Sequence, residues 1–218
     1  MGFGFSIEVW GDYALFTRPE LRVERYTYDV MTPSAARGIL EAIFWKPAIK
    51  YVIDSIVVLN EIKTTNVRRN EVTDKISAKT VAATMKGSKN NPLYLSTNDK
   101  IAQRASVVLK DVRYVIHAHF ELTDKLGETD TKEKFYNMIM RRIQKGQCFY
   151  NPYFGTKEFP AHFKLWENDK CSFYHNIERD FGLMLYDINY AGEDVSPMYY
   201  RAILKNGVIQ TRDVEVLT

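Results

Sequence analysis

The chain has 218 residues, 45% of them hydrophobic, so it is long enough to bury a core as one large or two small domains. It contains no run of 18 apolar residues, which excludes a membrane-spanning helix, and its N-terminus lacks the charged and apolar regions of a signal peptide. The two cysteines, Cys148 and Cys171, form neither a disulfide framework nor a CxxC pair, and they predict reduced thiols in a cytoplasmic protein.

The net charge of +3 is unevenly distributed. Between residues 61 and 110, ten Lys and Arg stand against four Asp and Glu, whereas from residue 166 onward nine acids stand against five bases. A basic segment of this kind favours contact with a polyanion, and the alternative is that its lysines only solvate a long loop. Because the basic residues are interleaved with Asn, Ser, Thr and Gly, we favour contact with nucleic acid.

The first elements follow from periodicity and from helix signals. Alternation of apolar and polar residues predicts a strand over residues 5–10. Thr32 and Pro33 have the pattern of an N-cap and a first helical residue, and they predict a helix through Trp45. Its buried stripe would consist of Ala36, Ile39, Leu40 and Ile43. A strand over residues 51–59 follows.

The basic segment at about 61–106 shows little periodicity, and we expect a long loop there, of the functional or mobile kind. A strand at 114–122 comes next, and then a helix over 131–145, opened by Asp130 and Glu133 as a capping-box pair and closed at Gly146. A short strand at 162–166 ends this part of the chain.

This order of elements predicts an α+β fold. The order β-α-β, basic insertion, β-α-β over residues 1–165 matches a ferredoxin-like, or RRM-like, plan with an antiparallel four-stranded sheet. The RNP1 signature is absent, so stacking of bases on the sheet face is not supported. Strands at 181–190 and 199–204, and a hairpin turn at Asn206-Gly207 into 208–210, predict a small C-terminal antiparallel β domain over 166–218.

The strand at 114–122 carries the main chemical signal. Its even-numbered residues form an apolar face: Tyr114, Ile116, Ala118, Phe120 and Leu122. His117 and His119 share the opposite face, with Arg113 just upstream, and lie about 7 Å apart at a rise of about 3.3 Å per residue. Such a pair can bracket one phosphodiester, with one ring at the attacking hydroxyl and the other at the leaving oxygen. Histidine titrates near neutrality, so the pair can supply both a base and an acid.

Two other interpretations of the histidines stay open. In the first, the two histidines are half of a metal site, with His162 and His175 as further ligands. In the second, they are two exposed residues on a solvated face. No cluster of Asp, Glu and His has a recognisable metal-ligand spacing, so we predict no metal and no cofactor.

Four strings resemble the CRISPR-associated Cas-five family, Dvulg (type I-C) subtype. They are GDYALFT at 11–17, IFWKP at 43–47, LKDVRY at 109–114 running into AHF at 118–120, and FGTKEF at 154–159. The resemblance spans nearly the whole chain. It implies a ferredoxin-like domain followed by a β domain, and a metal-independent endoribonuclease that cuts the repeat of precursor CRISPR RNA. It also implies that the protein stays on the crRNA 5′ handle as a subunit of the Cascade complex, with the repeat hairpin and other Cascade subunits as partners.

The resemblance implies an active site of a tyrosine, a lysine and a histidine. His119 matches the histidine, Phe44 occupies the position of the tyrosine without its hydroxyl, and His117 occupies the position of the lysine. We therefore expect His117 and His119 to work as the acid–base pair.

Two further groups would complete this site. Arg113 or Arg37 would supply a cation for the phosphorane charge. A hydroxyl of Tyr13, Tyr26 or Tyr28 is a candidate replacement for that of the tyrosine, and the sequence does not choose among the three.

We also predict a set of RNA contacts and one competing function. The predicted contacts are Tyr13, Arg37, Lys46, Arg68, Arg69, Arg104, Lys110 and Arg113. The basic surface would also permit non-specific binding of duplex DNA. The competing function is a non-catalytic subunit that holds the crRNA handle and has lost cleavage with the tyrosine.

Overall fold

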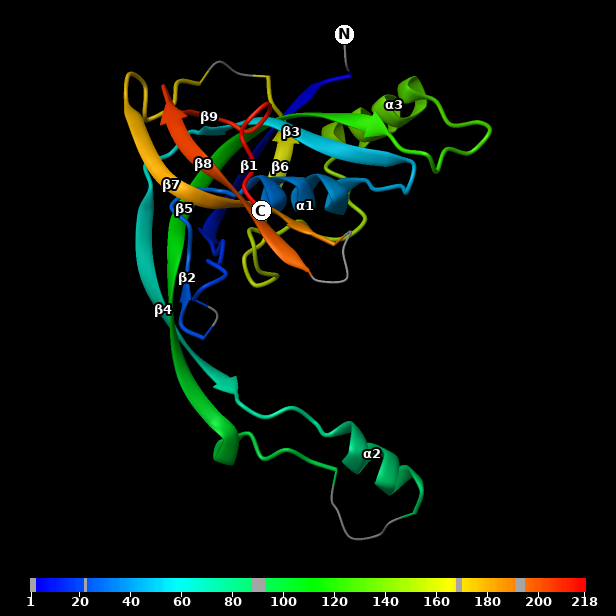
Figure 1. Ribbon diagram of the computed structural model, residues 1–218, viewed down its shortest axis with the longest axis vertical. Helices are drawn as coiled ribbons and strands as arrows, with labels where there is room; N and C mark the ends of the chain where they lie inside the picture. The colour runs from blue at the N-terminus through cyan, green and yellow to red at the C-terminus, as the bar shows by residue number, and fades with distance from the viewer. Residues whose placement is uncertain (1–2, 22, 88–92, 168–169, 191–194) are drawn as a thin grey trace.

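A computed structural model describes residues 3–21, 23–87, 93–167, 170–190 and 195–218 (Figure 1). Within these residues the chain forms one large, mainly antiparallel sheet with few helices, in the strand order β6-β1-β5-β3-β9-β8-β7, while β2 and β4 also pair with β5. The strands are β1 (Phe5–Ala14), β2 (Arg25–Tyr26), β3 (Ile49–Val58), β4 (Lys63–Val72), β5 (Ile101–Leu122), β6 (His162–Leu165), β7 (Glu178–Asn189), β8 (Ser196–Lys205) and β9 (Val208–Gln210). The α-helices are α1 (Pro33–Ile43), α2 (Ala78–Met85) and α3 (Lys132–Gln144). None of these helices is long and apolar enough to cross a membrane.

Helix α1 confirms the predicted N-terminal signal. The side chain of Thr32 accepts a hydrogen bond of 3.2 Å from the amide of Ala35, and Pro33 is the first helical residue. The predicted stripe of Ala36, Ile39, Leu40 and Ile43 is buried. The helix ends at Ile43, earlier than predicted, with Phe44 in an extended conformation as its C-cap.

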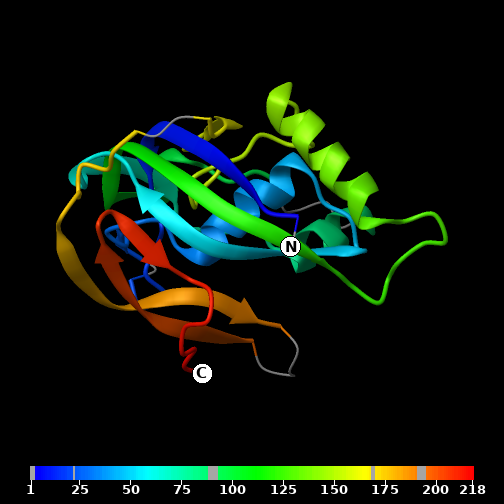
Figure 2. The ribbon, with the colours of Figure 1, turned by 90° about the horizontal axis from the view of Figure 1, so that it is seen from above.

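Helix α3 begins one residue later than the predicted capping box. Thr131, and not Asp130, is the N-cap, because its hydroxyl accepts from the amide of Lys134 at 3.2 Å. Asp130 instead accepts from the amide of Gly127 at 3.1 Å. The buried face of α3 consists of Phe135, Ile139 and Ile143, and the helix lies beside α1 (Figure 2).

The prediction of a long loop at 61–106 was wrong. Strand β4 pairs with the first half of β5, from Lys63 opposite Lys110 to Val72 opposite Ile101. This two-stranded ribbon extends away from the body and carries α2 at its end (Figure 1). We call residues 63–110 the arm. Its outer part lacks a buried face, so no apolar alternation marks its strands in the sequence.

The C-terminal strands extend the sheet. The predicted turn at Asn206-Gly207 joins β8 to β9, with positive φ angles of 51° and 80° at the two residues, as a type I′ turn requires. Strand β9 then pairs with β3, where Ser55 lies opposite Gln210 and Val57 opposite Val208. Strands β7, β8 and β9 are thereby hydrogen-bonded to the rest of the sheet.

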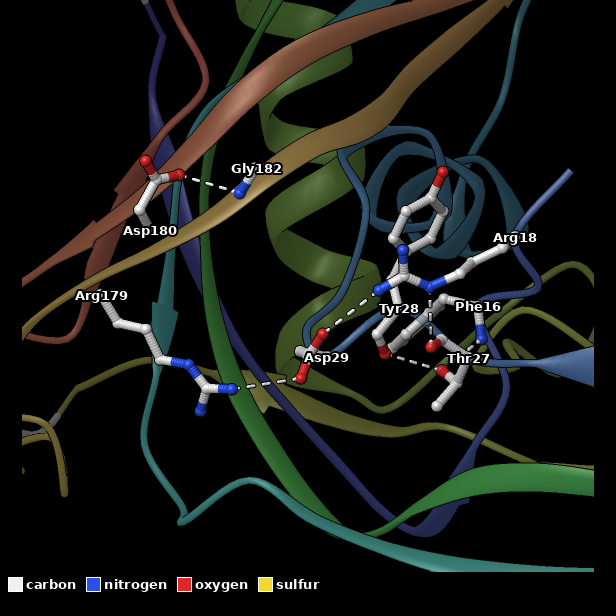
Figure 3. A network of polar contacts seen from close by, with 8 residues as sticks. All are labelled: Phe16, Arg18, Thr27, Tyr28, Asp29, Arg179, Asp180 and Gly182. Atoms are coloured by element: carbon white, nitrogen blue, oxygen red, sulfur yellow. Dashed lines mark hydrogen bonds and ion pairs between the residues drawn. The ribbon is translucent and has the colours of Figure 1, made fainter. Parts of the chain in front are cut away.

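A polar network also ties β7 to the segment between β1 and α1 (Figure 3). The carboxylate of Asp29 accepts from Arg18 and from Arg179 of β7, each at 3.3 Å. The guanidinium of Arg18 lies 4.7 Å from the centroid of the Tyr28 ring. The carboxylate of Asp29 and the ring of Tyr28 thus hold Arg18 in place, and Asp29 links it to β7.

Candidate active site

Strand β5 presents the two faces that its alternation predicts. Tyr114, Ile116, Ala118 and Phe120 are buried in the core, whereas His117 and His119 are half-buried on the opposite face. The neighbouring strands place Ser6 of β1 directly opposite His117, and Val52 of β3 opposite His119. We call the surface around His117, His119, Ser6 and Asp54 the histidine face.

His119 is paired with a carboxylate. Its Nδ1 lies 2.9 Å from Oδ2 of Asp54. A β-bulge brings Asp54 there, because Ile53 lies opposite Ala118 and Ser55 opposite His117, which leaves Asp54 as the extra residue of β3. An ionised Asp54 would accept a hydrogen bond from the Nδ1–H group of His119. Nε2 of His119 would then be the ring nitrogen available to a substrate.

The segment after β9 fixes the other side of Asp54. The amides of Thr211 and Arg212 donate to the Asp54 carbonyl at 3.1 and 3.2 Å. The guanidinium of Arg212 lies 3.5 Å from Oδ1 of Asp54, and its side chain is 58% exposed. The histidine face therefore contains a cation that solvent reaches.

His117 has a different environment. Its Nδ1 lies 2.7 Å from the hydroxyl oxygen of Ser6. Burial lowers the pKa of His117, and the charge of Asp54 opposes this effect only in part. Burial thus favours the neutral form of the ring, and a neutral imidazole can accept a proton.

Arg113, a predicted cation of the site, is bound to a carboxylate next to the histidines. Glu8 is fully buried, and it lies 2.6 Å from Arg113 and 3.1 Å from Lys164 of β6. Both cations also lie over the ring of Trp10, at 5.5 and 5.7 Å from its centroid. The buried charge of Glu8 thus engages Arg113 and Lys164.

Phe44 lies away from the histidines. Its ring is 2% exposed and packs 6.3 Å from that of Phe135 of α3. Its carbonyl accepts from the hydroxyl of Tyr51, whose side chain is on the core face of β3. Since His117 and His119 are on the opposite face, the sheet separates them from Phe44.

None of the three candidate tyrosines forms a hydrogen bond or a ring contact with the histidines among the described residues, and two of them are distant along β5. Tyr13 lies opposite Lys110, seven residues along β5 from His117, which corresponds to about 23 Å of strand. Tyr26 lies opposite Val107, farther along the same strand. Tyr28 is buried, and burial raises its pKa. The hydroxyl beside His117 belongs to Ser6 instead.

The remaining predicted RNA contacts divide into paired and unpaired cations. Arg37 donates to Asp187 of β7 at 2.7 Å, Arg104 lies 3.4 Å from Glu71, and Arg69 pairs with Glu158. Within the described residues, Lys46, Arg68 and Lys110 form no ion pair, and all three are exposed. Arg68, Arg69, Arg104 and Lys110 belong to the arm.

The alternative interpretation of the histidines as part of a metal site has no counterpart in the described part of the chain. No group of three or more His, Cys, Asp or Glu lies close enough to hold an ion there. His162, one of the suggested ligands, stacks on Trp10 with ring centroids 5.8 Å apart.

Sequence reasoning did not identify Ser6, Asp54 and Arg212 as site residues. One signal for Asp54 was present, because it is the only charged residue between Lys50 and Glu61, in a mainly apolar strand. A carboxylate within a buried strand requires a partner. Nothing in the sequence indicates that Arg212 lies beside it, since the two residues are 158 positions apart.

Comparison with known proteins gives consistent results. A family model described as CRISPR-associated protein (Cas_Cas5) matches residues 5–212. The CRISPR pre-crRNA endoribonuclease Cas5d of Mannheimia succiniciproducens is 51% identical over 208 residues, which cover 93% of this chain and 92% of that protein. The protein of the same name from Thermus thermophilus is 40% identical over 192 residues, which cover 88% of this chain and 76% of that protein.

Two solved structures share the fold. A structure titled "Crystal Structure of CRISPR-associated Protein" has a TM-score of 0.71 at 23% identity, and the match covers 99% of this chain and 96% of that one. A functionally uncharacterized protein from Streptococcus mutans has a TM-score of 0.70 at 22% identity, covering 99% of this chain and 97% of that one.

Proposed function

Since this chain belongs to the Cas5d family of CRISPR-associated proteins, we propose that it is an endoribonuclease that cuts precursor CRISPR RNA within the repeat. Both curated relatives carry the name CRISPR pre-crRNA endoribonuclease, and the relative with 51% identity matches over more than nine-tenths of both chains. The protein would then keep the 5′ handle as a subunit of a type I-C Cascade complex. The exposed cations of the arm would bind the phosphates of the RNA backbone. They would also bind duplex DNA without sequence preference.

One observation carries the proposed reaction, namely the two histidines with different partners on one face of β5. His117, kept neutral by burial, would take the proton of the 2′-hydroxyl as this oxygen bonds to phosphorus. His119, in the form protonated on both ring nitrogens and with its Nδ1–H donated to Asp54, would give the Nε2 proton to the 5′ oxygen as the bond of this oxygen to phosphorus breaks. Arg212 would stabilise the phosphorane, and the products would be a 2′,3′-cyclic phosphate and a 5′-hydroxyl.

The finer division of the fold is also part of this proposal. The antiparallel order β6-β1-β5-β3, with α1 and α3 as the connecting helices, supports a ferredoxin-like domain over residues 1–165. Residues 166–218 would then be a small β domain joined to it by the pairing of β9 with β3.

The proposal is tested on the repeat RNA of the host's own CRISPR array. We expect the purified protein to cut this RNA in EDTA, and a 2′-deoxy substitution at the scissile nucleotide to abolish cutting while binding persists, because DNA lacks the attacking hydroxyl. Cleavage of the deoxy substrate, or a requirement for added magnesium, would contradict the proposed reaction.

A second candidate function is supported by Phe44. The position of the family's tyrosine carries no hydroxyl here and is buried behind the sheet, which favours a subunit that only holds the handle. Tight RNA binding without any cleavage in the same assay would establish this alternative.

A further inference from the structure

A pocket of about 640 Å³ lies where α1 ends, between this end, α3 and residues 147–150. Its walls include Phe44, Trp45, Lys46, Arg142, Phe149 and Tyr150. The volume is within the range of about 300–1,000 Å³ of pockets that bind small ligands. Because Phe44 lies on the core side of the sheet, this pocket is separate from the histidine face.

Three aromatic side chains at this pocket are unusually exposed. Phe149 is 81% exposed, Trp45 56% and Tyr150 45%. A cluster of large, solvent-exposed aromatic side chains around one pocket indicates a binding surface, because exposing their rings to water is unfavourable in free energy.

The pocket is held rigidly by the end of α1. The last carbonyls of a helix lack partners within the helix, and here the loop and α3 supply them. The amides of Phe149 and Tyr150 donate to the carbonyl of Ala42 at 2.8 and 3.3 Å, and Arg142 donates to that of Ile43 at 2.7 Å. The aromatic residues are therefore in place before a ligand arrives, which lowers the entropic cost of binding.

The polar groups of the pocket match a nucleotide. Arg142 stacks over Phe44 at 5.3 Å from the ring centroid, and Lys46 is exposed at the rim without an ion pair among the described residues. Glu41 adds a half-buried carboxyl group whose pKa is raised by burial. A carboxyl group accepts hydrogen bonds from the amino groups of bases, and a lysine binds phosphate.

We propose that this pocket binds one unpaired nucleotide of the RNA, with its base against Phe149 and Trp45 and its phosphate at Lys46. The inference rests on the proposed function, because that function supplies RNA as the ligand. Aromatic side chains are the usual platform for unpaired bases, and they accept any base because every base has a π face. The RNA would thus contact the helix side of the molecule as well as the histidine face.

The test compares two exposed phenylalanines, each followed by a tyrosine. Phe149→Ala should weaken binding of a short fluorescein-labelled single-stranded RNA by about 5- to 150-fold, the range for removal of one stacked base. The salt dependence of binding should not change, because the same cations still neutralise the phosphates. Phe149→Trp should restore affinity, and Phe173→Ala, which removes an exposed ring outside the pocket, should have no effect.

Crosslinking separates this inference from the proposed function. RNA that carries 5-iodouridine should crosslink to Trp45, Phe149 or Tyr150, and it should do so equally in the His119→Ala variant. If His119→Ala still cleaves while the crosslinks persist, the assignment of the active site fails and the pocket stands. If Phe149→Ala binds RNA normally and the crosslinks lie elsewhere, the pocket does not bind RNA, as expected for a surface that receives a protein subunit.

Discussion

The pairing of His119 with Asp54 gives the most direct test of the proposed chemistry. His119→Ala should reduce the cleavage rate by about 100- to 10,000-fold, the usual contribution of a general acid or base. Asp54→Asn keeps the shape but replaces the carboxylate that orients the ring, so it should also lower the rate, while leaving RNA affinity unchanged. Single-turnover cleavage and anisotropy binding measure the two effects.

Asp124→Asn, which alters an exposed carboxylate, is the matched control for that experiment. NMR of the ring nitrogens of His119 adds a readout that a loss of stability would not change. In the neutral ring of the wild type the proton should be on Nδ1, and in Asp54→Asn this preference should disappear. Full activity of both His119→Ala and Asp54→Asn would place the active site elsewhere in the chain.

His117 predicts how stability depends on pH. Burial lowers its pKa in the folded protein, so the unfolded chain, with an ordinary value of about 6.5, binds the proton first as pH falls. The contribution is therefore fully present above about pH 6.5 and is lost as pH falls from there toward the lower folded value. Urea unfolding at a series of pH values should show a smaller loss of stability in His117→Gln; identical curves would contradict this account.

At the scale of the elements, the arm should carry the salt-dependent part of RNA binding. Arg68, Lys75 and Lys79 are exposed on it, whereas Arg69 is already paired with Glu158. Replacing the first three by alanine should weaken binding and lower the slope of log affinity against log salt by about 0.7 to 0.9 for each phosphate that is no longer neutralised. Replacing Lys125, Lys132 and Lys170, which are also exposed and outside the arm, should leave the slope unchanged.

The elements also show what the sequence alone can predict. Helix α1 and the alternating part of β5 were predicted because one face of each is buried, so that apolar spacing reports the element. The arm was not predicted, because its outer part has no buried face and its strands are held there by backbone pairing. The pairs of His119 with Asp54 and of Asp54 with Arg212 were also missed, since a bulge and a distant segment create them.

At the scale of the molecule, residues 166–218 are joined to the rest by backbone pairing and by ion pairs. Strand β9 pairs with β3, and Asp29 binds Arg179 while Arg37 binds Asp187. We therefore expect one cooperative thermal transition, with equal calorimetric and van't Hoff enthalpies. Two separate transitions would mean that residues 166–218 unfold as an independent unit.

The bulge of β3 limits where chains of this family can gain or lose residues. The extra residue, Asp54, lets Ile53 and Ile56 both face the core although they are three positions apart. Deleting one residue here would turn every side chain on one side of it to the wrong face of the sheet. Insertions and deletions among related chains should therefore avoid residues 53–55 and concentrate at the tip of the arm, where no packed core depends on the register.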